Sequence, residues 1–201
     1  MTSTRDLIIL LNKECDSSLS DDEWLDFLSL AEEIHLKKNQ TLIEPDKVDR
    51  DVYIVKEGII KCVDFDGQRE RVNAFGFPGT IFKSASSFYK AIPSDLHFMA
   101  CCPTVILRIA HDEFINYTET HHRFAMYALH YAWFELYLAH HRESTVHNGT
   151  TRERYLQVCK HRPRLTTEVS NQDLASYLGV TPQYLSRVKT AIMREQRRRQ
   201  K

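Results

Sequence analysis

The stretch that decides the fold is residues 169–192, VSNQDLASYLGVTPQYLSRVKTAI. Ser170, with an acidic residue three positions later, resembles a capping box and predicts the start of a short helix. Gly179 can adopt the left-handed conformation that ends a helix, and Thr181 and Pro182 are residue types that begin a second one. We therefore expect two helices joined by a tight turn and packed through apolar side chains: Leu174, Ala175, Tyr177, Leu178, Val180, Leu185, Val188 and Ile192.

The second of these helices has a polar, cationic outward face. Gln and Arg side chains recognise the edges of adenine and guanine in the major groove of DNA. The pattern predicts a helix-turn-helix that binds double-stranded DNA, and the alternative is an ordinary helical hairpin. We expect the DNA-contacting residues to be Ser170, Thr181, Gln183, Tyr184, Ser186, Arg187 and Lys189.

The net charge of zero conceals an asymmetry along the chain. Residues 1–149 carry 15 basic and 23 acidic side chains, whereas residues 150–201 carry 12 basic and 4 acidic ones. A basic C-terminal part on an acidic body fits a polyanionic partner for that part alone. A solvated basic tail would explain only the last residues, because the bias already begins at Arg152.

The preceding part of the chain is predicted to be mainly β-sheet. Short apolar stretches recur roughly every ten residues between residues 34 and 109, separated by Gly, Pro and Asp. Asp66-Gly67 is a strong hairpin signal, and the whole pattern predicts an antiparallel jelly roll or barrel. A capping box at Ser20 opens a helix before these strands. The fold class is therefore α+β. We expect adjacent Cys101 and Cys102 to be buried strand residues, and the alternative is a redox or metal sensor.

These motifs together resemble the Crp/Fnr family of bacterial transcription regulators. Besides the helix-turn-helix, the barrel half contains Glu57-Gly58-Ile59-Ile60-Lys61 and Pro78-Gly79-Thr80-Ile81-Phe82, in an order similar to the family's cyclic-nucleotide-binding fold. The resemblance implies a sensor barrel at residues 1–118, a dimerisation helix and hinge at 119–147, and a DNA-binding domain at 148–201. It also implies a homodimer, with RNA polymerase and an unknown small-molecule effector as further candidate partners.

Family members that bind cyclic AMP carry Gly-Glu-Leu and then Arg-Ser/Thr-Ala in a phosphate cassette. The matching stretch here has a hydrophobic residue at the glutamate position, no arginine near Ser94, and Asp95, which would repel phosphate. We therefore expect no cofactor and no response to cyclic AMP. What remains is a candidate effector pocket, either filled by its own side chains or open to an apolar ligand, lined by Phe75, Phe77, Phe82, Lys83, Phe88 and Tyr89.

A long helix predicted over residues 123–141 is apolar on more than one face, so it must be covered on two sides. One side can lie on the barrel and the other on a second copy of the same helix. The two stripes are Ala125, Leu129, Ala132 and Leu136, and Tyr127, Tyr131, Phe134 and Leu138. Residues 146–150 form the expected hinge, and residues 151–161 a connecting helix. The basic tail after Ile192 is too short for the β-hairpin wing of many family members, so we expect a helical extension or a basic arm.

The sequence has no enzyme signature. Five cysteines lack CxxC spacing, and adjacent histidines on a helix point in different directions, so we predict neither a metal site nor catalytic residues. No apolar run approaches the ~20 residues of a membrane span, which makes a cytoplasmic location the expectation. Two competing hypotheses are a cupin-like metal-dependent enzyme or ligand-binding protein with a helical tail, and a relic DNA-binding domain that acts only through protein contacts.

Overall fold

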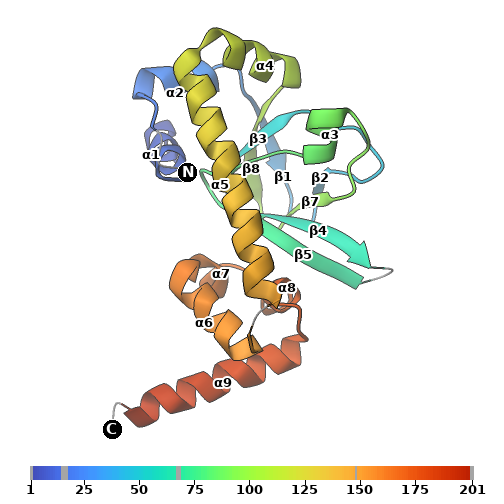
Figure 1. Cartoon of the computed structure of the whole chain (residues 1–201), viewed down its shortest axis with the longest axis vertical. Coiled ribbons are helices and arrows are strands. Elements are labelled where there is room, and N and C mark those ends of the chain that lie inside the picture. Colours follow the sequence, from blue (N-terminus) through green and yellow to red (C-terminus); the bar gives the residue numbers. More distant parts are fainter. Residues whose placement is uncertain (1, 15–17, 67–68, 148, 200–201) are drawn as a thin grey trace. The chain divides into compact units, whose positions relative to one another are not determined.

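The computed structural model describes residues 2–14, 18–66, 69–147 and 149–199. They form two compact units, one of Met1–Asp64 with Ala74–Tyr137 and one of Phe65–Asn73 with Leu138–Lys201. The elements, labelled in Figure 1, are α1 (Thr4–Glu14), α2 (Asp21–Leu28), β1 (Glu32–Leu36), β2 (Thr41–Ile43), β3 (Val52–Glu57), β4 (Ile60–Asp66), β5 (Arg69–Gly76), β6 (Ile81–Phe82), α3 (Ala85–Lys90), β7 (His97–Ala100), β8 (Thr104–Ile109), α4 (His111–Thr120), α5 (His122–His147), α6 (Thr151–His161), α7 (Pro163–Thr167), α8 (Asn171–Tyr177) and α9 (Pro182–Arg199).

The strands form two four-stranded sheets, in the orders β1-β8-β3-β6 and β2-β7-β4-β5. The pairing is antiparallel, with Ile54 opposite Leu107 between β3 and β8 and Cys62 opposite Phe98 between β4 and β7. Apolar side chains from both sheets meet in one buried core, as expected for a β-sandwich or jelly roll. The predicted α+β fold class with an antiparallel sheet core is therefore confirmed.

The Glu57-Gly58 motif before β4 needs glycine at its second position. Its φ angle is +82°, and a Cβ atom at this position would lie 2.4 Å from Thr104 Oγ1 and 2.7 Å from the Pro103 carbonyl oxygen. Only glycine fits such a positive φ together with such a close approach. The turn between β3 and β4 can therefore pack directly against the start of β8.

A second core in the same unit surrounds the N-terminal half of α5, where α1, α2 and α4 gather (Figure 1). It is rich in edge-to-face aromatic pairs, such as Trp24 against Tyr127 at a centroid distance of 4.9 Å. Asn12 of α1 organises its polar edge, because its Oδ1 accepts hydrogen bonds from Trp24 Nε1 (2.8 Å) and the Leu19 backbone (3.1 Å). The α5 stripe of Tyr127, Tyr131 and Phe134 thus faces the barrel unit.

The second unit has its own small core of helices α6 to α9. Tyr155, Val158 and Leu165 of α6 and α7 are buried beside the α8 and α9 side chains. The segment Phe65–Asn73 belongs to this unit. There the Ser176 hydroxyl of α8 donates to the Glu70 carbonyl (3.0 Å) and accepts from the Val72 amide (3.0 Å). One serine thus occupies two of the backbone groups that β5 would otherwise offer to another strand.

Several sequence expectations need correction. Cys101 and Cys102 are not buried strand residues: they lie half-buried in the bend between β7 and β8, because the chain reverses there before Pro103. Helices α1 and α3 and the short α7 were not predicted. The basic tail continues α9 as a helix to Arg199. The expected hinge includes Asn148, which lies outside the described residues, and the division into three domains stays a prediction. Among the described residues, no helix is long and apolar enough to span a membrane.

Candidate nucleic-acid interface

The helix pair α8–α9 forms where the local sequence predicts it. The Ser170 hydroxyl caps α8 by accepting a hydrogen bond from the Asp173 amide (3.0 Å). The same hydroxyl donates a hydrogen bond to the Asp173 carboxylate (2.7 Å). Gly179 ends α8 with φ +68°, and Thr181 Oγ1 accepts the Tyr184 amide (3.2 Å) to cap α9. Pro182 is the first residue of α9, where its missing N–H costs nothing.

Apolar packing fixes α9 against the rest of this unit. Helix α9 packs against α8. Leu185 and Ile192 are buried on α9, and Leu174, Ala175 and Leu178 are buried on α8 and at its end. A small side chain at Ala175 permits a close helix crossing. Truncating such a fully buried leucine as Leu185 to alanine typically costs about 2–5 kcal/mol. The inner face of α9 therefore holds the helix in place and leaves the opposite face free.

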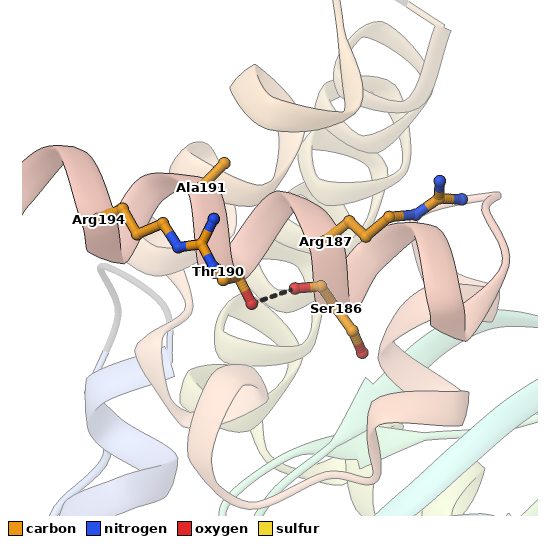
Figure 2. A pocket seen from close by; sticks show the side chains of 5 residues that line it. All are labelled: Ser186, Arg187, Thr190, Ala191 and Arg194. Carbon is orange, nitrogen blue, oxygen red and sulfur yellow. Dashed lines mark hydrogen bonds between the residues drawn. The ribbon is translucent and has the colours of Figure 1, made fainter.

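That opposite face exposes Gln183, Tyr184, Ser186 and Arg187. The Arg187 guanidinium carbon lies 5.7 Å from the centre of the Tyr184 ring, a cation–π distance. Further along α9, an open groove is lined by Ser186, Arg187, Thr190, Ala191 and Arg194 (Figure 2). The Arg194 side chain runs back along the helix toward Thr190, whose hydroxyl donates to the Ser186 carbonyl (2.9 Å).

Sequence reasoning did not select Thr190, Ala191 or Arg194. The signal was available, because these residues follow Arg187 by three, four and seven positions, the spacing of one helix face.

Lys189 is not on the outward face, contrary to the sequence prediction. Its Nζ donates to Asn171 Oδ1 (2.9 Å) and lies 5.6 Å from the centre of the Tyr155 ring. Burial lowers the pKa of this lysine. The reason is geometric, since Lys189 follows Leu185 by one helical turn and so shares its inward direction. Its ammonium group binds within the protein.

Other basic residues of the unit divide into paired and unpaired groups. Arg152 pairs with Glu195 (2.6 Å), and Arg164 pairs with Glu168 (2.6 Å). Among the described residues, the recorded ion pairs include none with Arg187, Arg194, Arg197 or Arg198, and all four side chains are exposed. Unpaired positive charge is thus available to a polyanion along α9.

The residues of the predicted effector pocket are brought together only in part: Lys83 Nζ lies 5.8 Å from the centre of the Phe88 ring, but the other members point to different surroundings. Phe82 lies inside the barrel, between Tyr53 (5.5 Å between ring centroids) and Phe98 (5.2 Å), in a stack of three rings. Phe88 packs against the helical core instead, and Tyr89 is 83% exposed on α3. Phe75 is buried, Phe77 is half-buried, and Lys83 pairs with Glu135 of α5 (2.7 Å).

The structure also shows how α5 is bonded to the barrel, on which one of its sides was expected to lie, although the sequence did not indicate the specific contacts. The Tyr131 hydroxyl accepts a hydrogen bond from the Ile81 amide and donates one to the Ile81 carbonyl, both at 2.8 Å. The Lys83–Glu135 ion pair lies one helical turn further along α5. Strand β6, which belongs to the stretch matched to the phosphate cassette, is therefore tied to α5 by the protein's own side chains.

Histidines and cysteines form no metal site that the structure reveals. Within the described residues, no group of three His, Cys, Asp or Glu side chains could hold a metal ion. His121, one of the paired histidines, stacks on Tyr117 at a centroid distance of 3.9 Å. Its ring is thus occupied by a local aromatic contact.

Residues 33–121 match the sequence profile of the cyclic nucleotide-binding domain. This span runs from β1 to the end of α4 and so contains both sheets. The barrel unit is thus similar to the cyclic nucleotide-binding domain in sequence and has an antiparallel sheet core of the same kind. No curated protein matches the chain.

Solved structures of regulators share the fold beyond this domain. FixK2 from Bradyrhizobium japonicum is 19% identical with a TM-score of 0.70, covering 82% of this chain and 85% of that one. CLP of Xanthomonas campestris, described as a c-di-GMP responsive global regulator, is 14% identical with a TM-score of 0.70, covering 88% and 93%. A CooA mutant from Carboxydothermus hydrogenoformans is 19% identical with a TM-score of 0.69, covering 85% and 79%. At these identities the likeness is one of fold.

Proposed function

We propose that the protein is a sequence-specific, DNA-binding transcription regulator of the Crp/Fnr type. The observation that carries this proposal is the outward face of α9, where Arg187 stands exposed on a helix whose inner face is buried. A rigidly held helix presenting Arg and Gln side chains is suited to reading base edges in the major groove. The fold similarity to the gene-expression regulator CLP supports the same reading.

The residues take different parts in this proposal. Gln183, Ser186 and Arg187 would meet base edges, since they lie on the first turns of α9. Arg194 would follow them along the DNA major groove. Arg197 and Arg198 would contact only phosphates, which carry no sequence information. Ser170 and Thr181 stay candidate contacts, although their hydroxyls already serve as helix caps.

Selection of DNA tests this function. Random duplexes enriched on the purified protein should converge on a short motif, and binding to that motif should exceed binding to random DNA. Recovery of unenriched, random sequences at low salt would contradict sequence-specific recognition. A failure to bind any DNA would favour the relic hypothesis, in which the domain acts only through protein contacts.

We further propose that α5 joins two copies of the protein. Its outer face exposes Met126, Leu129, Trp133, Leu136 and Tyr137, and Trp133 and Leu136 are 60% and 69% exposed. These residues follow helical spacing, so they form one apolar stripe that a globular monomer rarely exposes. The same face of a second α5 is self-complementary in a two-fold dimer. Such a dimer would bind two half-sites separated by about one helical turn of DNA, roughly 34 Å.

We also propose that the barrel does not respond to cyclic AMP. The stack of Tyr53, Phe82 and Phe98 occupies the barrel core with rings that are all buried. Thermal unfolding with millimolar cyclic AMP, and in parallel cyclic di-GMP, should give the same melting temperature as without a nucleotide. A saturable rise with either compound would contradict this part of the proposal and leave DNA binding intact. RNA polymerase stays a candidate partner.

A further inference from the structure

The side-chain amide of Asn171, the first residue of α8, makes three polar contacts with α9. Its Nδ2 donates to the Pro182 carbonyl (3.2 Å) and lies 3.4 Å from Ser186 Oγ. Its Oδ1 accepts from Lys189 Nζ (2.9 Å). Both ends of one amide group therefore bind a single neighbouring helix.

The three partners lie along one edge of α9, between its buried and its outward faces, at spacings of four and seven residues. The Pro182 carbonyl also accepts from the Ser186 hydroxyl (3.0 Å), so the first turn of α9 is bonded twice at this edge. Contacts at both ends of a two-turn stretch restrain rotation of the helix about its own axis. Apolar packing alone tolerates such rotation better, because it is not directional.

Lys189 completes the arrangement from within the protein. A half-buried ammonium is costly unless hydrogen-bonded, and here the Asn171 oxygen and the Tyr155 ring face compensate. The Cys159 side chain lies near both Tyr155 and the same ammonium. The lysine thus holds Asn171 in the orientation in which its amide nitrogen points at Pro182 and Ser186.

We propose that Asn171 is a positioning residue for DNA recognition, which fixes the rotation of α9 so that Arg187 meets a base edge. The proposal rests on the proposed DNA-binding function. Arg187 directly follows Ser186. If the Asn171 contacts were lost and α9 rotated about its axis, the Arg187 guanidinium would move with it. Bidentate recognition needs side-chain placement within about 0.5 Å, which a rotating helix cannot provide.

The test compares affinity for a selected operator with affinity for random DNA, at two salt concentrations. Asn171→Ala should lower the operator-to-random affinity ratio about tenfold, as the loss of a good base contact does. Affinity for random DNA and the salt dependence should stay unchanged, because no phosphate contact is lost. Gln157→Ala, an exposed amide on α6, is the matched control and should change neither quantity.

Two further variants separate positioning from direct contact. Lys189→Gln keeps a donor for Asn171 and should retain specificity, whereas Lys189→Met should lose it. A direct phosphate contact by Lys189 would instead flatten the salt dependence by about 0.9 in both variants. That result would contradict the proposal.

A double-variant cycle separates this proposal from the function on which it rests. If Asn171 acts through Arg187, adding Asn171→Ala to Arg187→Ala should cause no further loss of specificity. Full additivity of the two losses would contradict the positioning role. If Arg187→Ala removes specificity but Asn171→Ala leaves it intact with a normal melting temperature, the positioning role alone is wrong. If the parent protein does not prefer its operator, the proposed function fails first.

Discussion

The Arg187 guanidinium lies over the Tyr184 ring, 5.7 Å from its centre and one turn further along α9. Both side chains are exposed, so the contact restrains a long side chain that would otherwise sample many rotamers. Tyr184 thereby supports Arg187 in an extended conformation, and Figure 2 shows the Arg187 side chain stretched along the helix toward the beginning of α9.

Tyr184→Ala should weaken operator binding modestly, and Tyr184→Phe should retain it. An exposed cation–π contact contributes about 0.5–1 kcal/mol, or roughly two- to fivefold in affinity. Fluorescence anisotropy with labelled operator measures the difference. Equal losses in both variants would show that the hydroxyl, and not the ring, makes the relevant contact.

A charge on the outer face of α5 should dissociate the proposed dimer. Leu129→Glu buries an unpaired carboxylate against its symmetry mate, a cost that apolar packing cannot offset. Sedimentation at micromolar concentration should show a dimer for the parent protein and a monomer for the variant. Ala85→Glu, at an exposed site on α3, should remain dimeric. A stable parent monomer would contradict the assignment. Tyr131 is unsuitable for this test, because it is buried and bonded to Ile81.

Tyr131→Phe should instead destabilise the barrel unit. The change leaves the Ile81 amide and carbonyl without the hydroxyl that satisfies both. An unsatisfied buried polar group costs about 1–3 kcal/mol. Urea denaturation should show a lower unfolding midpoint with an unchanged slope. An unchanged midpoint would mean that the Tyr131 bonds contribute little net stability.

Asp49→Asn should change how stability depends on pH. Burial raises the pKa of Asp49, although the Tyr53 hydroxyl donates to its carboxylate (2.8 Å to Oδ2) and opposes the rise. A raised folded-state pKa means that protonation favours the fold. This contribution is fully present below the unfolded pKa, about 3.9, and is lost as pH rises through the folded value.

Relative to the parent protein, the Asn variant should therefore gain stability as pH rises from about 4 toward neutrality. Urea denaturation of both proteins across this range measures the difference. Asp112→Asn is the control of opposite sign, because a hydrogen bond with His111 lowers the pKa of Asp112. A pH-independent difference between Asp49→Asn and the parent would contradict the account.

Capping and turn residues explain which parts of the fold the sequence could predict. Ser170, Gly179, Thr181 and Pro182 act on backbone groups within a few residues, so their effect on α8 and α9 follows from spacing alone. The Ser20 capping box worked for the same reason, with its Glu23 carboxylate accepting the Ser20 amide (2.8 Å). The strands followed from alternation and turn residues.

What sequence could not predict depends on distant partners. Lys189 turns inward and hydrogen-bonds to Asn171, which lies 18 positions earlier. Tyr131 hydrogen-bonds to Ile81, which lies 50 positions earlier. The predicted pocket includes Tyr89, yet this residue of α3 is exposed at the surface. Composition and spacing do not encode such three-dimensional neighbours.

The most direct test of base recognition by α9 compares Arg187→Ala with a double variant, Arg197→Ala and Arg198→Ala, on operator and random DNA. Arg187→Ala should weaken operator binding about tenfold to a hundredfold while leaving random DNA nearly unchanged. The double variant should weaken both DNAs alike and flatten the salt dependence. If Arg187→Ala weakens operator and random DNA equally, α9 does not read sequence and the central claim is wrong.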